Sequence, residues 1–526
     1  MEKAYRFGTN VSYELTSNPY TPSSLGDPTM GWSLTTRDSM GRVTSVAQYA
    51  TSNPPGTAGN LSQQGNLAGQ PPPASWGSNT TTTGLVSTAY NLQLSGCAGA
   101  AVSSTDEANY IRYYCPDGLG RLVGVTEPNA NVTTYGYDLL DNLTSVSMGS
   151  RSFLYSSLSR QMCASNPESA TTPCPTASTA AQIGGLDWYT YDPNGNLASH
   201  TDARGTSATM TYDGLNRVKT RNYTAGVNTA ATPNVSYLYD QDTKGTLYSV
   251  TTSLGNTVYT HDKLGRVTGS RPFTNGTGYP FTYAYSLSDQ LAITQYPTGR
   301  VVNYGFDTAD RVTSVTGPSS KTYISTITYK PASIPNTLAL ANGLTETYTW
   351  NDRLQLVGLN AGNALALSIF PCDQGYTSCT SGNTGGTWRE TITTNGALNA
   401  VQEFRHDSLN RLLTASEKPA QFTVQPSCPG STSVWCRQFG YDAPGNRTIA
   451  GRSPNGSESW DVNSISSSTN KILDAGWNYD AAGNIIGANN AGTSVAVQYD
   501  AENRQVAYCY TYTANCVNTP GAGVTV

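Results

Sequence analysis

The chain has 526 residues and a formal net charge of −5, and only 12% of its residues are charged. It contains 51 glycines, 28 prolines and 34 tyrosines, whereas disordered chains usually combine high net charge with few aromatic residues. We therefore expect a folded protein that is mostly β-structure. Nucleic acid is excluded as a partner because Lys and Arg do not cluster, and no apolar run is long enough for membrane insertion.

Four segments follow one another along the chain. Residues 1–49 form an N-terminal segment with one outlying copy of a repeat, and residues 50–110 have the Pro-, Gly-, Ser- and Thr-rich composition of a linker or insertion. The repeat array covers residues 111–512, and residues 513–526 form a C-terminal tail. The beginning of the chain lacks the apolar core of a signal peptide, so either export uses another route or the chain is part of a longer one.

An internal repeat has the pattern aromatic-Asp-x-x-(Gly/Asn/Asp)-(Arg/Asn)-aliphatic. Asp117 and Asp138 stand 21 residues apart, as do Asp192 and Asp213, which leaves room for one β-hairpin with roughly eight residues per strand. Degenerate copies begin at Tyr155, Tyr239, Tyr285 and Trp350. Eleven copies are defined by Asp38, Gly41, Arg42, Asp117, Gly120, Arg121, Tyr137, Asp138, Tyr191, Asp192, Gly195, Tyr212, Asp213, Asn216, Arg217, His261, Asp262, Gly265, Arg266, Phe306, Asp307, Arg311, His406, Asp407, Asn410, Arg411, Tyr441, Asp442, Gly445, Tyr479, Asp480, Gly483, Tyr499, Asp500, Asn503 and Arg504.

The residue types of the repeat predict a tight turn between two strands. The Asp carboxylate can accept backbone N–H bonds released at the strand end, and the residue three positions later is always one that tolerates a left-handed backbone. The Arg that often follows can lie back toward the Asp as a charge-assisted pair. Alternating rings such as Tyr189 and Tyr191 lie on one face of a strand. Because this chemistry recurs in every copy, we interpret it as scaffold.

The ten cysteines form five pairs that are close in sequence. No pair has the spacing Cys-x-x-Cys, and with only three histidines a zinc site of the usual kind cannot be assembled. Local disulfides in an oxidising compartment are the main interpretation, and unpaired thiols in the cytosol are the alternative. The predicted pairs are Cys97–Cys115, Cys163–Cys174, Cys372–Cys379, Cys428–Cys436 and Cys509–Cys516.

The repeat resembles the YD repeats of bacterial Rhs proteins, which also build the B and C components of insecticidal toxin complexes and the extracellular shell of teneurins. The resemblance covers most of residues 111–512 and the copy at Asp38. It implies consecutive long hairpins in one continuous coiling sheet, all or part of a hollow β-shell. Toxin-bearing relatives end in an Asp-Pro-containing autoprotease module and a toxin domain. Here the only Asp-Pro steps lie at Asp27 and Asp192, so we expect neither element in this chain.

The sequence predicts no catalytic residue, metal site or cofactor. His261 and His406 occupy the aromatic position of the repeat, and His200 can pair with Asp202 but has no triad around it. Residues 192–196 superficially resemble a calcium loop, but the bidentate Glu expected at its twelfth position is missing.

The sequence leads to two main functional hypotheses. A third, a toxin activity in the chain itself, is disfavoured because the sequence contains no catalytic motif. The first is a non-enzymatic shell scaffold, secreted or associated with the cell envelope, that encloses, presents or delivers a polypeptide cargo encoded elsewhere and contacts further shell segments. The alternative is a cell-surface adhesin whose exposed Tyr and Trp rings bind glycans. The structural interpretation of the same rings is that they pack against residues of neighbouring strands.

Overall fold

The computed structural model describes residues 3–7, 10–19, 29, 31–49, 84–169, 172–176, 182–372, 382–395, 399–419, 435–453, 461–490, 493–510 and 523–524. These residues are all-β apart from a short 3-10 turn at Pro318–Ser320, which confirms the predicted fold class. Nowhere among them does a helix have the length and apolar character needed to cross a bilayer.

The strands have the following bounds. The first twelve are β1 (Lys3–Phe7), β2 (Val11–Ser17), β3 (Trp32–Asp38), β4 (Val43–Tyr49), β5 (Gly84–Leu92), β6 (Ala101–Thr105), β7 (Ile111–Pro116), β8 (Leu122–Thr126), β9 (Val132–Tyr137), β10 (Leu143–Val146), β11 (Arg151–Tyr155) and β12 (Gln161–Ser165). The next twelve are β13 (Asp187–Tyr191), β14 (Leu197–Thr201), β15 (Ser207–Tyr212), β16 (Val218–Thr224), β17 (Val235–Tyr239), β18 (Leu247–Thr252), β19 (Gly255–His261), β20 (Val267–Thr274), β21 (Thr277–Gly278), β22 (Phe281–Tyr285), β23 (Leu291–Gln295) and β24 (Val301–Phe306). The last are β25 (Val312–Thr316), β26 (Thr322–Tyr329), β27 (Pro335–Leu340), β28 (Thr345–Trp350), β29 (Leu356–Ala361), β30 (Leu365–Phe370), β31 (Arg389–Thr394), β32 (Asn399–His406), β33 (Leu412–Pro419), β34 (Trp435–Tyr441), β35 (Arg447–Ser453), β36 (Asn478–Tyr479), β37 (Ile485–Asn490), β38 (Thr493–Tyr499), β39 (Gln505–Tyr510) and β40 (Gly523–Val524).

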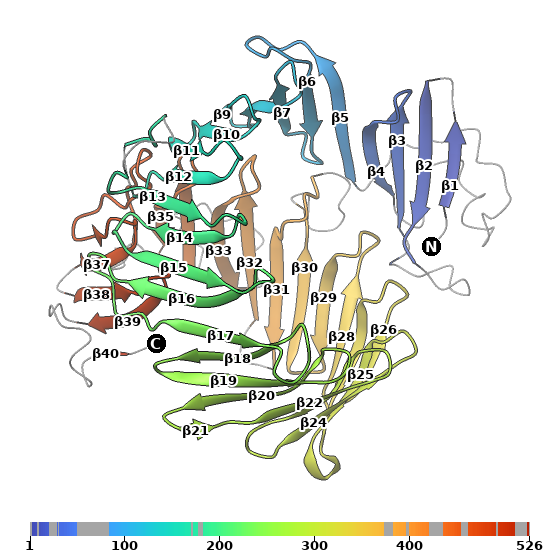
Figure 1. Ribbon diagram of the computed structural model, residues 1–526. Coiled ribbons are helices and arrows are strands. Elements are labelled where there is room, and N and C mark those ends of the chain that lie inside the picture. Colours follow the sequence, from blue (N-terminus) through green and yellow to red (C-terminus); the bar gives the residue numbers. More distant parts are fainter. Residues whose placement is uncertain are drawn as a thin grey trace. The chain divides into compact units, whose positions relative to one another are not determined.

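The chain forms two compact units, which are described separately. Unit 1 comprises Met1–Val132, Tyr304–Gly440 and Ile449–Gly456, and unit 2 comprises Thr133–Asn303, Tyr441–Thr448 and Ser457–Val526. In each unit consecutive strands pair antiparallel, as β1 to β8 do in unit 1 and β12 to β20 do in unit 2 (Figure 1). Of the described strands, 35 belong to one sheet and five to a second. This confirms the predicted array of hairpins.

The strands are shorter than predicted. Strands β14, β15 and β16 have five, six and seven residues, against the roughly eight expected. The reason is that each 21-residue copy contains two turns rather than one. The Asp turn joins the two strands of one hairpin. A second turn, at the opposite ends of the strands, joins this hairpin to the next, as the turn between β14 and β15 does.

Residues 50–110, predicted to be a linker or an insertion, form part of the sheet in their second half. Gly84–Leu92 and Ala101–Thr105 form β5 and β6, which pair with each other and with β4 and β7. The backbone hydrogen bonds of the sheet, together with one buried residue at the start of each strand, outweigh the weak β-propensity of this composition. Residues 50–83 lie outside the described residues. Within the predicted C-terminal tail, Gly523–Val524 forms β40, which pairs with β39.

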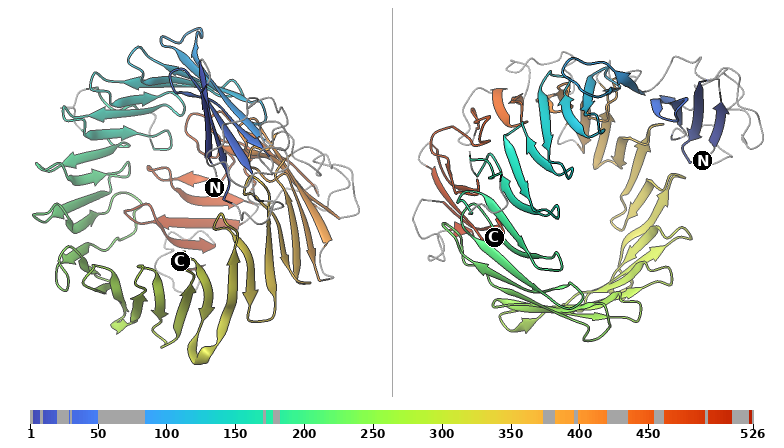
Figure 2. Two further views of the ribbon diagram at one scale, coloured as in Figure 1. Left: turned by 90° about the vertical axis from the view of Figure 1, so that its right-hand side faces the viewer. Right: turned by 45° about the horizontal axis from the view of Figure 1, so that its top comes forward.

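Neither unit carries a helical layer over its sheet in the described residues (Figure 2). Apolar residues are therefore buried in small local clusters. One in unit 1 is formed by Leu15, Trp32, Leu34, Ala47 and Tyr49, and one in unit 2 by Leu154, Cys163, Cys174, Leu186 and Trp188. A sheet held together in this way depends on contacts between neighbouring hairpins, so its stability is distributed along the array.

Candidate functional site

All eleven copies of the repeat form the same three-residue hairpin loop. In the copy at Asp213, the Asp N–H donates to the carbonyl of Arg217 (2.9 Å), and the N–H of Asn216 donates to the Asp213 carbonyl (3.0 Å). The residue three positions after the Asp has a positive φ in every copy, between 57° at Asn503 and 97° at Gly445. This is a type I turn followed by a left-handed residue, which produces the register shift seen just before the Asp in β15 and its equivalents.

The Asp side chain completes this turn. Asp213 Oδ1 accepts the N–H groups of Leu215 (2.9 Å) and Arg217 (3.0 Å), and its Oδ2 accepts Nε of Arg217 (2.7 Å). In each of the eleven copies Oδ2 accepts a bond from the Arg or Asn side chain four residues later. In three degenerate copies the two N–H groups are accepted instead by Ser156, Ser286 and Asn351.

These contacts stabilise the ionised carboxylates. The pKa of Asp38, Asp117 and Asp307 lies below its usual value, first because of the hydrogen bond from the Arg side chain and also because of the backbone N–H groups. The same effect is larger at Asp240, where Nη1 and Nη2 of Arg217 donate to the two carboxylate oxygens at 3.1 and 2.5 Å and lower the pKa to about 2.

Acid is therefore expected to weaken the turns. A carboxyl group whose pKa is lower in the folded than in the unfolded state contributes stability that is complete above the unfolded pKa and is lost as the pH falls through the folded pKa. For Asp240 this window extends from about 4 in the unfolded chain down to about 2. Urea unfolding followed by circular dichroism between pH 7 and pH 2 should show stability that declines most steeply below about pH 4. Stability that rises on acidification would contradict this account.

In six hairpins of the described residues, the aromatic residue that ends the first strand is clamped by the preceding hairpin. Tyr239 donates its hydroxyl hydrogen to the carbonyl of Val218 at 3.0 Å, and the guanidinium of Arg217 lies 4.3 Å from the centre of its ring. Equivalent hydroxyl or indole bonds to the residue that follows the preceding turn are made by Tyr191, Tyr212, Tyr285, Tyr329 and Trp350. Asp, Arg and ring thus connect neighbouring hairpins, a contact that the spacing within one copy did not reveal.

Replacing Tyr239 by phenylalanine is expected to cost about 1 kcal/mol, because it removes one hydrogen bond and leaves a carbonyl without its donor while the ring stays in place. Hydrogen exchange of β16 and β17 measures this loss locally. Tyr237→Phe on the same strand is the matched control, because no hydrogen bond of its hydroxyl group occurs among the described residues. Equal effects of the two substitutions would show that the bond to Val218 contributes nothing.

The three histidines occupy structural positions. His200 stacks on Tyr189 with ring centres 4.7 Å apart, and its Nε2 lies 3.5 Å from Asp187 rather than near Asp202, so the suggested His200–Asp202 pair is wrong. His261 contacts Asp242 through Nδ1 at 2.9 Å. His406 lies edge-on to Trp388 at 5.1 Å. Within the described part of the chain, no group of three or more His, Cys, Asp or Glu residues is arranged to hold a metal.

Two of the predicted disulfides lie wholly within the described residues and are present. Cys97 bonds to Cys115 across 18 residues, and Cys163 bonds to Cys174 across 11. Cys372, Cys436 and Cys509 are also disulfide-bonded. Their predicted partners Cys379, Cys428 and Cys516 lie outside the described residues, so these three pairings stay predictions.

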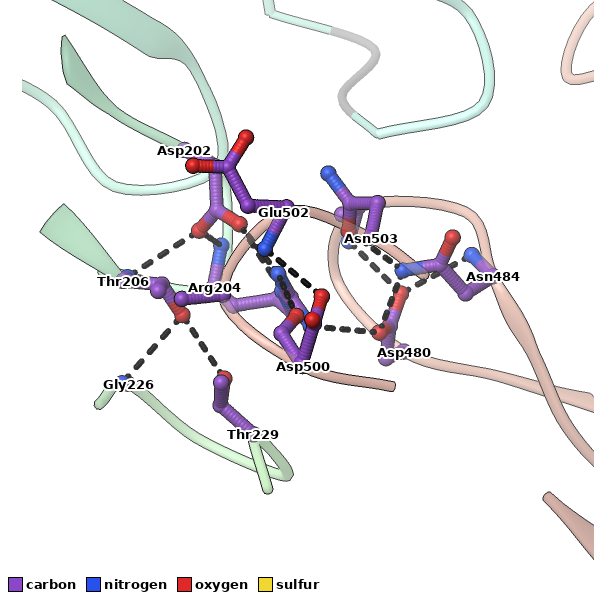
Figure 3. Close-up of polar contacts among 12 residues, drawn as sticks. Asp202, Arg204, Thr206, Gly226, Thr229, Asp480, Asn484, Asp500, Glu502 and Asn503 are labelled. Carbon is purple, nitrogen blue, oxygen red and sulfur yellow. Dashed lines mark hydrogen bonds and ion pairs between the residues drawn. The ribbon is translucent and has the colours of Figure 1, made fainter. Parts of the chain in front are cut away.

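A buried charge cluster in unit 2 was not expected from the sequence (Figure 3). The side chain of Arg204 is 0% exposed and donates through Nε to Asp202 Oδ2 (2.8 Å) and through Nη2 to the carbonyl of Asp500 (3.0 Å), while Nη1 lies 3.8 Å from Asp480. Because Asp480 and Asp500 belong to turns of the second sheet, Arg204 holds that sheet against the turn between β14 and β15.

Further contacts support this junction. The N–H of Ala230 donates to the carbonyl of Tyr499 at 2.8 Å, and the hydroxyl of Tyr223 donates to Glu502 at 2.5 Å. The signal for Arg204 was present in the sequence, since Asp202 and Gly205 have the Asp-to-Gly spacing of the repeat and the same turn hydrogen bonds. Sequence reasoning missed it because the Arg stands two rather than four residues after the Asp, and because its other partners are almost 300 residues away.

The sequence profile of the RHS repeat matches residues 117–152 and 191–227. No curated protein matches the chain in sequence. Among solved structures the fold is similar to TcdB2-TccC3 without its hypervariable C-terminal region (12% identity, TM-score 0.58), to TcdB2-TccC3-Cdc42 (11%, 0.53) and to a Photorhabdus luminescens Tc holotoxin pore with a TccC3 mutation (11%, 0.52).

The similarity to these structures covers 96% of this chain but only 30% or 31% of theirs, so the chain spans about a third of their length. At such low identity the likeness concerns the fold alone. The turn is stronger evidence for the kind of repeat than the fold is. All eleven copies have the same turn hydrogen bonds and a left-handed residue at the same position. Together with the matched profile, these features identify the repeats of this chain as RHS repeats.

Proposed function

We propose that the chain is a non-enzymatic segment of a YD-repeat β-shell that encloses, presents or delivers a polypeptide cargo encoded elsewhere. The observation that carries this proposal is the clamp between neighbouring hairpins, in which a turn Asp, its Arg and a ring of the next hairpin, such as Asp213, Arg217 and Tyr239, connect one hairpin to the next. The fold shared with Tc toxin components supports it. A wide sheet built in this way offers a surface to another polypeptide, and this role requires no catalytic centre in the sheet.

The contacts of the candidate catalytic groups support a scaffold. The repeat Asp carboxylates are used to close turns, and the histidines pack on rings or pair with an Asp. The clamped tyrosines bond to backbone carbonyls, so their rings have a structural role and no observation favours glycan binding by them. Secretion or attachment to the cell envelope is part of the proposal, supported by the disulfides, since these persist in oxidising compartments.

Co-expression of the chain with each polypeptide encoded next to its gene tests the proposed enclosure. At least one of these polypeptides should be recovered with the chain and should resist trypsin under conditions that digest it alone. The control is the same polypeptide mixed with the chain after both have been purified, since enclosure has to occur during folding. Recovery of none of them, or digestion at the same rate with and without the chain, would overturn the proposal.

A further inference from the structure

Unit 1 contains a cavity of about 250 Å³ that the repeat chemistry does not explain. Three parts of the chain line it. Asp106 and Tyr110 come from the turn between β6 and β7, Trp388 directly precedes β31, and His406 and Asn410 come from the end of β32 and the turn after it. The volume is close to the lower end of small-ligand pockets, so the cavity has room for one small organic group.

Asp106 differs from the Asp of every repeat copy. Its Oδ1 accepts the N–H groups of Ala108 (2.9 Å) and Tyr110 (2.8 Å), as in the other turns. The residue four positions later is Tyr110, however, where all eleven copies have an Arg or Asn that donates to Oδ2. Among the described residues nothing donates to Asp106 Oδ2, so this carboxylate has no counter-charge.

The other two carboxylates of the lining are neutralised. Glu107 pairs with Arg353 at 2.6 Å, and Asp407 pairs with Arg411 at 2.6 Å. Burial lowers the pKa of His406, so this ring is neutral near pH 7 and does not repel a cation. Of the three carboxylates in the lining, Asp106 is therefore the one that no Arg of the described residues neutralises.

The rings of the lining suit a positively charged group. Tyr110 is 40% exposed and stands at the position where an Arg would otherwise pair with Asp106. Trp388 already has a cation near its ring, because the guanidinium of Arg405 lies 5.6 Å from the ring centre. Tyr110 therefore remains as the aromatic face available to a ligand. A cation beside an aromatic face and a carboxylate is favoured by both, and more so where water is partly excluded.

We propose that this cavity binds an organic monocation with a guanidinium or ammonium group, whose charge lies against Asp106 and whose apolar side contacts Tyr110. The ligand chemistry is that of an arginine or lysine side chain, and the source is either a small free amine or such a side chain on another polypeptide. Glu107 and Asp407 are excluded as the carboxylates that hold it because their charges are compensated by Arg353 and Arg411.

Isothermal titration of the full chain at low salt with butylguanidine, which carries one positive charge, with an arginine-containing peptide and with the same peptide containing citrulline tests this site. At least one of the two cations should bind with a Kd of about 1 mM or below, and the citrulline peptide should bind at least about tenfold more weakly. Binding of butylguanidine points to a small free cation, and binding of the arginine peptide alone points to a side chain of another polypeptide.

Asp106→Asn is the decisive variant, because an asparagine keeps the Oδ1 acceptor of the turn and removes only the charge. It should weaken cation binding about tenfold, while the far-UV circular dichroism and the melting temperature stay unchanged. Asp289→Asn is the matched control, since it removes one charge from an exposed turn in unit 2. Equal binding of the arginine and citrulline peptides, no binding of either cation, or unchanged binding by Asp106→Asn would overturn the proposal.

Discussion

Replacing Arg204 by methionine is expected to destabilise the junction between the second sheet and strands β14–β17 by about 3–5 kcal/mol. The guanidinium is fully buried, and its removal leaves Asp202 and Asp480, whose side chains are 4% and 1% exposed, without their cation. An uncompensated buried charge costs far more than the loss of a surface ion pair. Methionine fills most of the volume of the arginine stem, so the effect reports the charge rather than a cavity.

Hydrogen exchange followed by mass spectrometry measures this effect in β36 to β39 and in the turn between β14 and β15. Both should exchange faster in the variant, while β1 to β8 of unit 1 should keep their rates. Arg266→Met is the matched control, because Arg266 is 28% exposed and pairs with the half-buried Asp262 and the exposed Asp289. This variant should lose much less stability. Equal exchange in the two variants would show that burial of the Arg204 cluster has no energetic consequence.

Removal of the Cys163–Cys174 disulfide by a double substitution to alanine is expected to cost at least about 3 kcal/mol. A cross-link that closes about ten residues contributes roughly this amount by restricting the unfolded chain, whatever surrounds it. Here both cysteines are also buried in the cluster with Leu154, Leu186 and Trp188, so the smaller alanines leave a gap as well. Thermal unfolding under non-reducing conditions should therefore show a lowered transition for unit 2.

The Cys97–Cys115 disulfide provides the comparison. It closes a longer segment, 18 residues against 11, so chain entropy alone predicts an equal or larger loss when it is removed. Neither of its cysteines is fully buried. We expect the Cys163→Ala/Cys174→Ala variant to lose more than the Cys97→Ala/Cys115→Ala variant. The opposite order would show that loop closure rather than burial decides the contribution of these disulfides.

Local chemistry explains why the turns were predictable. Whether Asp213 closes a turn depends on residues within four positions of it, all visible in the sequence, and Asn216 tolerates the left-handed backbone for reasons that lie within the residue itself. The prediction of a linker or insertion over residues 50–110 did not reveal the strand Gly84–Leu92, for the opposite reason. The polar composition of this segment gives it only a weak β-propensity, and pairing with β4 and β6 outweighs that weakness.

The sequence by itself determined that this protein is a β-hairpin repeat, which residues form the eleven repeat turns and which cysteines to consider as pairs, because each of these depends on short-range geometry that recurs. Only the tertiary structure decided that Tyr239 is clamped by the preceding hairpin, that Arg204 joins turns almost 300 residues apart and that Asp106 stands without a counter-charge beside a cavity. These contacts depend on which hairpins lie side by side. A short-range motif contains no information about residues that the folded chain brings to it from far away.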